Sequence, residues 1–94
     1  MTPEKVLDVI GLYKNFFERL GIDKIDFPHG KFPSRSSAAE EEILPHCHGM
    51  LDKMEAFVRE GRMEKAFRWL GFIQGCLWSM GYFTLNELKN DNRP

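Results

Sequence analysis

The chain has 94 residues and a formal net charge of −1; 43% of its residues are hydrophobic and 13% are aromatic. This length allows one domain, residues 1–94, and this composition excludes intrinsic disorder. The balanced charge gives no global attraction to nucleic acid or to an anionic membrane. No apolar run is long enough to span a bilayer, and we find no signal peptide, so we expect a cytoplasmic protein with Cys47 and Cys76 as buried thiols.

The first predicted helix begins at Thr2-Pro3, because a hydroxyl at the N-cap and a proline in the first turn favour a helix start. Apolar residues then recur every three or four positions up to Gly21, a residue type common just after a helix. These apolar positions are Val6, Val9, Ile10, Tyr13, Phe16, Phe17 and Leu20.

Residues 22–37 are the irregular part of the chain, with two prolines, one glycine and three serines. A short extended piece is possible over residues 24–27. Basic residues are interleaved with aromatic ones in this loop: Lys24, Phe27, His29, Lys31, Phe32 and Arg35. Loops of this length are uncommon in compact domains and are often functional, so this loop is where we expect a ligand.

The second predicted helix opens at Ser37, which with Glu40 has the form of a capping box. Pro45 lies about two turns in, where it either kinks the helix or marks the start of its regular part. The helix ends at Gly61. Its apolar stripe consists of Leu44, Cys47, Leu51, Met54 and Val58.

The third predicted helix, residues 62–82, is apolar around its whole circumference, which is typical of a buried helix. The turn before it is so short that helices two and three must form an antiparallel hairpin. One stripe of helix three faces helix two, and it consists of Ala66, Leu70, Ile73, Leu77 and Met80. Gly71, Gly75 and Ser79 form a second stripe on roughly the opposite side, beside Trp78 and Tyr82.

The chain ends with a short predicted helix. Gly81 ends helix three, and Thr84 with Glu87 forms a second capping-box pattern that opens a helix to about Lys89. The polar residues 90–94 are expected to fray. The predicted fold is therefore all-α: an N-terminal helix, a basic loop, a long antiparallel helical hairpin and a short C-terminal helix.

The glycine stripe of helix three predicts close helix packing. A glycine inside a helix costs about 0.5–1 kcal/mol relative to alanine, so two of them one turn apart indicate a contact worth more than that cost. Either helix one lies in this groove, or a second copy of the chain does. The high aromatic content of so short a chain favours a homo-oligomeric bundle with Gly71, Gly75, Ser79 and Trp78 at its interface.

The basic loop leads into a helix N-terminus, where free backbone N–H groups, hydroxyls and cations attract phosphate. The candidate phosphate ligands are Lys24, Lys31, Ser34, Arg35, Ser36 and Ser37, and the candidate residues that stack on or line the ligand are Phe27, Phe32 and Tyr13. A nucleotide-like anion fits this set. The alternative is an ordinary polar loop before a capped helix, because Glu40–Glu42 already complement the helix dipole.

Other site types have weaker support. His46 and His48 diverge on a helix and cannot share a metal ion, so we interpret them as surface histidines flanking a core cysteine, and we expect no metal or cofactor. No paired-carboxylate or nucleophile motif indicates a hydrolase. The basic residues Arg59, Arg62, Lys65 and Arg68 alternate with Glu55, Glu60 and Glu64, which suggests ion pairs rather than nucleic-acid binding.

The C-terminal third, residues 64–94, resembles a group of small uncharacterised proteins of tailed bacteriophages. The resemblance rests on Arg68-Trp69-Leu70-Gly71-Phe72-Ile73-Gln74-Gly75, Leu77-Trp78, Gly81, Thr84, Glu87-Leu88-Lys89 and Asn92-Arg93-Pro94. In architecture alone the chain is similar to small phage proteins that sequester the cyclic-nucleotide signals of bacterial defence, the anti-CBASS and anti-Thoeris sponges. The characteristic hairpin sequence of those sponges is not present here.

Two functions follow as hypotheses. The first is a non-enzymatic phage accessory protein in the host cytosol that forms a homo-oligomer and sequesters a phosphorylated small molecule, such as a cyclic-nucleotide defence signal. The second is an interaction module that binds and inhibits a host protein through an apolar helix face. Neither needs a membrane or nucleic acid.

Overall fold

The computed structural model describes the backbone of residues 1–25 and 37–93, and the side chains of residues 1–25 and 41–93. In these ranges the regular elements are all helices, which confirms the predicted all-α class for this part of the chain. The helices are α1 (Pro3–Arg19), α2 (Ser37–Arg59), α3 (Met63–Ser79) and α4 (Leu85–Asp91).

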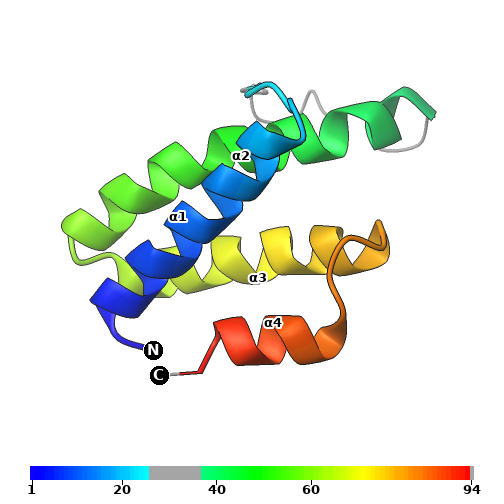
Figure 1. The fold of residues 1–94 in the computed structure, drawn as a ribbon. Helices are drawn as coiled ribbons and strands as arrows, with labels where there is room; N and C mark the ends of the chain where they lie inside the picture. The colour runs from blue at the N-terminus through cyan, green and yellow to red at the C-terminus, as the bar shows by residue number, and fades with distance from the viewer. Residues whose placement is uncertain (26–36, 94) are drawn as a thin grey trace.

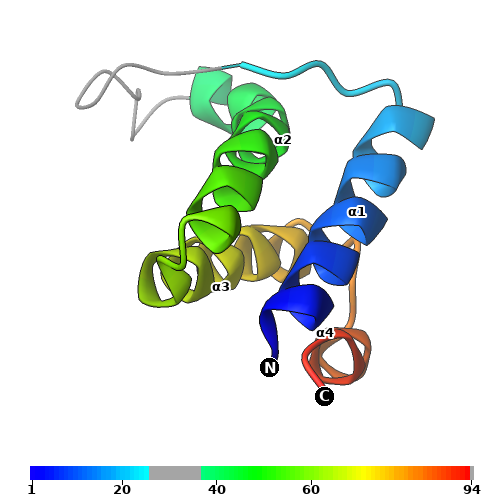
Figure 2. The ribbon, with the colours of Figure 1, turned by 90° about the vertical axis from the view of Figure 1, so that its left-hand side faces the viewer.

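Helix α3 lies between α2 above it and α4 below it, and α1 packs beside α2 (Figures 1 and 2). After α2 the chain reverses at Gly61, whose φ of +79° favours glycine, and α3 runs back below α2. Helix α4 follows α3 and ends near the start of α1, so the two chain ends lie close together in both views. Among the described residues, no helix combines the length and the hydropathy of a membrane span.

The predicted helix ends at Thr2, Gly21 and Thr84 are confirmed. The Thr2 hydroxyl accepts a hydrogen bond from the Lys5 N–H at 3.1 Å, and Gly21 has the left-handed φ of +69°. Thr84 and Glu87 exchange the two hydrogen bonds of a capping box, each 3.1 Å long. The other predicted capping box, at Ser37, lies outside the described side chains.

The core forms where α1, α2 and α3 meet, and the predicted apolar stripes supply most of it. Three predicted core positions differ: Leu20 is exposed, and Phe16 and Met80 are only partly buried. The buried apolar residues are Val6, Val9, Ile10, Tyr13 and Phe17 from α1, Leu44, Cys47, Met50, Leu51, Met54 and Val58 from α2, Ala66, Leu70, Ile73 and Leu77 from α3, and Leu88 from α4.

A buried polar network ties α4 to this core. The Tyr13 hydroxyl donates to Asp91 at 2.8 Å and accepts from the Gln74 amide at 3.1 Å. Gln74 also pairs with Asn92 through two hydrogen bonds of 2.6 and 3.0 Å. The prediction of a frayed tail from residue 90 is therefore wrong for Asp91 and Asn92, because both side chains have partners in the interior.

Helix α2 continues through Pro45 rather than beginning there. The Ile25 N–H donates to the Pro45 carbonyl at 3.1 Å, so the segment after α1 crosses directly over α2. This crossing requires a glycine at position 49, because a Cβ atom there would lie 2.3 Å from the Ile25 carbonyl oxygen.

We expect Gly49→Ala to lower the free energy of unfolding by about 1–3 kcal/mol, because the added methyl group displaces the Ile25 backbone. Gly11→Ala is the matched control, since a Cβ atom at Gly11 in α1 meets nothing within 4 Å. It should raise the free energy by about 0.5–1 kcal/mol. Urea unfolding of both variants measures the difference. Equal stabilisation by the two substitutions would contradict the close crossing at Ile25.

Candidate interaction surface

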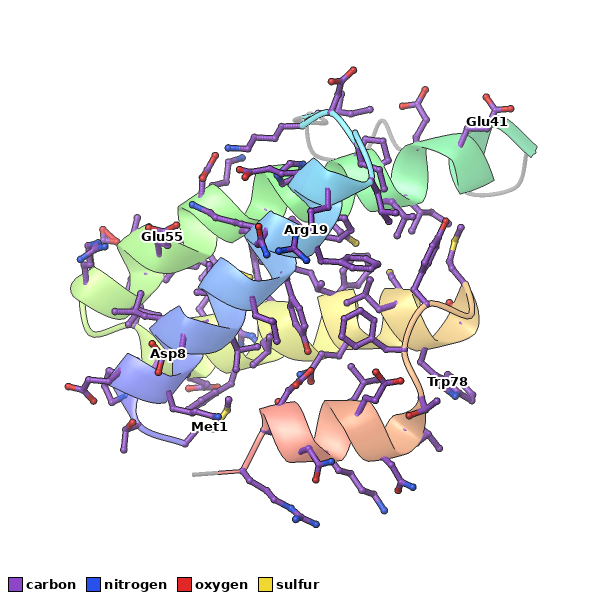
Figure 3. The ribbon with its side chains drawn as sticks, in the orientation of Figure 1. Met1, Asp8, Arg19, Glu41, Glu55 and Trp78 are labelled. Atoms are coloured by element: carbon purple, nitrogen blue, oxygen red, sulfur yellow. The ribbon has the colours of Figure 1, made fainter. Side chains whose placement is uncertain are left out.

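The side of α3 that faces away from the core carries large exposed side chains. Phe67 is 41% exposed, and Phe72 and Trp78 are each 52% exposed. Figure 3 shows Trp78 near the end of α3, on the side away from α1 and α2. The prediction that α3 is buried all round is therefore wrong for the single chain, because α1 and α2 cover only one side of it. We call Phe67, Gly71, Phe72, Gly75, Trp78 and Ser79 the α3 outer face.

The two glycines of the α3 outer face are exposed. A Cβ atom built on Gly71 or Gly75 meets no atom of the described residues within 4 Å. Helix α1 therefore does not lie against these glycines. This excludes the first of the two predicted occupants of the glycine groove, the N-terminal helix of the same chain. The nearby Ser79 is exposed, and its hydroxyl donates to the Cys76 carbonyl of its own helix at 3.1 Å.

Charge is distributed unevenly along α3. Its beginning carries Arg62, Lys65 and Arg68, whereas its last turn has no basic residue. As the sequence predicts, Arg68 and Arg59 are in i,i+4 ion pairs, with Glu64 and Glu55 respectively, both at 3.6 Å. The Lys65 ammonium lies over the Phe57 ring, 4.6 Å from its centroid.

An aromatic hollow adjoins the uncharged end of α3. It has a volume of about 530 Å³, and none of its described lining residues is basic. Tyr82 and Leu85 are among its exposed apolar residues. We call it the Trp78 hollow, and its lining residues are Trp78, Gly81, Tyr82, Phe83, Thr84, Leu85 and Asn86.

Two of the predicted ligand residues lie in the part of the chain whose side chains are described, and both have structural partners. Tyr13 is fully buried, and its ring meets Phe83 edge-on at 5.4 Å, so it does not serve as a stacking surface. Burial raises the pKa of its hydroxyl above the ordinary value. Lys24 is in an ion pair with Asp52 at 3.0 Å. The other predicted ligand residues, Phe27, Lys31, Phe32, Ser34, Arg35, Ser36 and Ser37, lie outside the described side chains.

A cavity of about 670 Å³ lies beside Lys24, between the segment after α1, the first half of α2 and the end of α3. Lys24 is the one basic residue among its described lining residues, whereas Asp23 and Glu41 contribute two carboxyl groups. Tyr82 and Met80 close its far side. We call it the Lys24 cavity.

His48 is buried, so its interpretation as a surface histidine is wrong. Its Nδ1 lies 2.7 Å from the Ile22 carbonyl oxygen and therefore donates to it. Its ring packs against Phe17, with the ring centroids 5.2 Å apart. This histidine anchors the segment after α1 and faces the interior. In the described part of the chain, no three His, Cys, Asp or Glu side chains are grouped closely enough to hold a metal ion.

Cys47 and Cys76 are free thiols that face one another across α2 and α3. Cys47 is fully buried, as predicted, and Cys76 is partly exposed. The hydrogen bond to Cys76, together with burial, raises the pKa of the Cys47 thiol. The same hydrogen bond lowers the pKa of Cys76, against its burial.

Comparison of the chain with protein-family models, with curated proteins and with solved structures finds no match in any of the three. The candidate surface therefore has to be interpreted from its own geometry.

The ion pairs between α1 and α2 had no clear signal in the sequence. Lys14 contacts both Glu55 and Asp52, and its Nζ lies 2.7 Å from an Asp52 oxygen. Hydrogen bonds from Lys14 and Lys24 lower the pKa of Asp52 below its ordinary value. The four residues come from three segments that are far apart in sequence, and they are brought together only by packing.

We expect this network to make stability depend on pH. The ionised Asp52 carboxylate contributes fully to the free energy of unfolding above the ordinary carboxyl pKa of about 4. This contribution is lost as the pH falls through the lower pKa that Asp52 has in the folded state. Because the Asp52 side chain is 49% exposed, solvent screening limits its contribution to about 1 kcal/mol or less.

Urea unfolding at a series of pH values from 7 to 3 measures this contribution. Asp52→Asn should be less stable than the native chain at pH 7 and should lose less stability on acidification. Asp8→Asn is the control, because Asp8 is exposed on α1 and is in no ion pair with the described residues (Figure 3). If the free energy of unfolding changed with pH in the same way for the native chain and for Asp52→Asn, the proposed ion-pair network would be contradicted.

Proposed function

We propose that this protein is a non-enzymatic binding module whose α3 outer face packs against an α-helix of another protein chain. The observation that supports this proposal is the open pair Gly71 and Gly75 between exposed aromatic side chains. A helix backbone can approach closely only where side chains are small, and aromatic residues beside such a groove supply the buried area.

The composition of the face fits protein binding better than solvent exposure. Each helix-interior glycine costs about 0.5–1 kcal/mol, and no contact within the described part of the chain compensates for it at Gly71 or Gly75. Aromatic side chains are enriched among the residues that dominate binding energy at protein interfaces. The half-exposed Phe72 and Trp78 are therefore the expected energetic centre of this surface.

The resemblance of residues 64–94 to small phage proteins gives this module a context. In that context the partner is a protein of the bacterial host or the phage protein itself, and binding interferes with host defence. This part of the proposal rests on the sequence, and the α3 outer face supplies the surface through which such binding would act.

The Lys24 cavity supports a second candidate, the sequestration of a phosphorylated small molecule such as a cyclic nucleotide. The cavity lies where the chain enters the basic loop, and Tyr82 in its wall can stack on a base. Against this, the Lys24 ammonium is already paired with Asp52, and Asp23 and Glu41 repel an anion. Phosphate binding therefore depends on the predicted loop residues Lys31, Arg35 and the three serines.

For the first candidate, we expect Phe72→Ala/Trp78→Ala to abolish capture of the partner when the tagged protein is incubated with a lysate of bacteria that also express the untagged chain. The control is Leu12→Ala/Leu20→Ala, which removes two equally exposed apolar side chains from α1 and its C-cap, outside the α3 outer face. The control should capture the same partner as the native chain. Equal capture by all three proteins would contradict a specific role for the α3 outer face.

For the second candidate, titration calorimetry with a panel of cyclic di- and trinucleotides and cyclic ADP-ribose isomers is the direct test. We expect at least one member to bind, with Arg35→Ala weakening its affinity about tenfold or more because a charge-assisted phosphate contact is lost. Lys89→Ala removes an exposed cation on α4, outside the predicted ligand set, and should leave affinity unchanged. If no member of the panel binds, the sequestration proposal fails.

A further inference from the structure

We infer that the occupant of the α3 outer face is the same face of a second copy, packed antiparallel so that Arg68 of each copy enters the Trp78 hollow of the other. This inference rests on the proposed function, because it names the partner of that same surface. The argument uses the register of the face, its charge and the Trp78 hollow.

The register of α3 favours pairing with itself. Glu64, Arg68, Gly71, Gly75 and Ser79 follow one another at intervals of three or four residues, which places them along one line of the helix. Helix α3 has 17 residues and is therefore roughly 25 Å long. A two-fold axis midway between the glycines sets Gly71 of one copy opposite Gly75 of the other, and both backbones then meet where no side chain separates them.

The charge of the face selects the antiparallel direction. A parallel pair sets Arg68 against Arg68 of the second copy, and like charges repel. In the antiparallel pair, Arg68 reaches the last turn of the neighbouring α3, which has no basic residue of its own. The carbonyl groups at that end carry the negative pole of the helix dipole, so a cation there is favourable.

The Trp78 hollow completes the match at this end. With the glycines facing each other, the same register sets Arg68 opposite Trp78, which is half exposed. A guanidinium over an indole face gains a cation–π interaction. Within its own chain, the Arg68 Nη1 lies 3.6 Å from the Oε1 of the exposed Glu64. A surface ion pair of this kind is weak, so Arg68 can leave it for the contact with Trp78 of the second copy.

The test is sedimentation equilibrium of the full chain, with the free energy of unfolding measured in parallel. We expect the native protein to be a dimer in a concentration-dependent equilibrium with monomer. Gly71→Ala/Gly75→Ala should weaken association about tenfold or more while stabilising the monomer, because both methyl groups point into open space in a single chain. The control Gly11→Ala should stabilise the chain and leave association unchanged.

A charge exchange tests the direction of packing. Arg68→Glu and Trp78→Lys should each weaken association, and the double variant should associate more tightly than either single variant, because the opposite charges again face each other across the dimer. In a parallel dimer, residue 68 of one copy faces residue 68 of the other. The double variant would then associate no more tightly than the single variants. A double variant weaker than both single variants overturns the antiparallel arrangement.

The remaining outcomes separate this inference from the proposed function. If the native chain is a monomer at its highest soluble concentration, yet Phe72→Ala/Trp78→Ala still abolishes capture of another protein, the second copy is the wrong partner and the binding function stands. If the chain is a monomer and capture does not depend on Phe72 and Trp78, both fail. If it associates but Gly71→Ala/Gly75→Ala leaves the affinity unchanged, the glycine groove is not the interface and the inference fails.

Discussion

The burial of one stripe of α3 against α1 and α2 is the constraint on which the rest of this structure depends. Leu70, Ile73 and Leu77 leave water only because two helices cover the same side of α3. A chain of 94 residues has one more described helix, α4, and its seven residues are too few to cover the opposite side. The exposed aromatic residues and open glycines of α3 follow directly from this shortage of covering elements.

The angle at which the helices meet is fixed by polar contacts that surround the apolar core. At one end, hydrogen bonds that are buried or partly buried join α1, α3 and α4 through Tyr13, Gln74, Asp91 and Asn92. At the other, the segment after α1 is held on α2 by the Ile25–Pro45 hydrogen bond and by His48. Buried polar groups are costly unless they are paired, so these contacts permit little change in the packing.

The Trp78 hollow and the Lys24 cavity share a residue. Tyr82 lines both the Trp78 hollow and the Lys24 cavity, at the point where the chain leaves α3. A partner that enters the hollow therefore contacts a side chain that also borders the cavity. The two proposed functions are compatible for this reason, and an assembly through α3 provides a route by which association and ligand binding would influence each other.

By itself, the sequence determined the helices and most of their described ends, because the 3.6-residue periodicity, the N-cap hydroxyls at Thr2 and Thr84 and the terminal glycines are local signals. It also predicted Gly71, Gly75 and Trp78 as an interface, since the cost of glycine in a helix interior follows from the sequence alone. It did not find the roles of Tyr13, His48 or Lys24: an apolar-face tyrosine, a histidine beside a cysteine and a lysine in a loop each fit a site or a structural contact equally well.

Only the tertiary structure decided between those roles, because each depends on groups distant in the chain. Tyr13 is a core residue because Asp91 and Gln74 reach it, and Lys24 is a structural cation because Asp52 lies beside it. Likewise, the α3 outer face is open because α1 packs elsewhere, which is a matter of which helix covers which side. Periodicity defines the apolar side of a helix, but the area available from the other helices determines how much of it is covered.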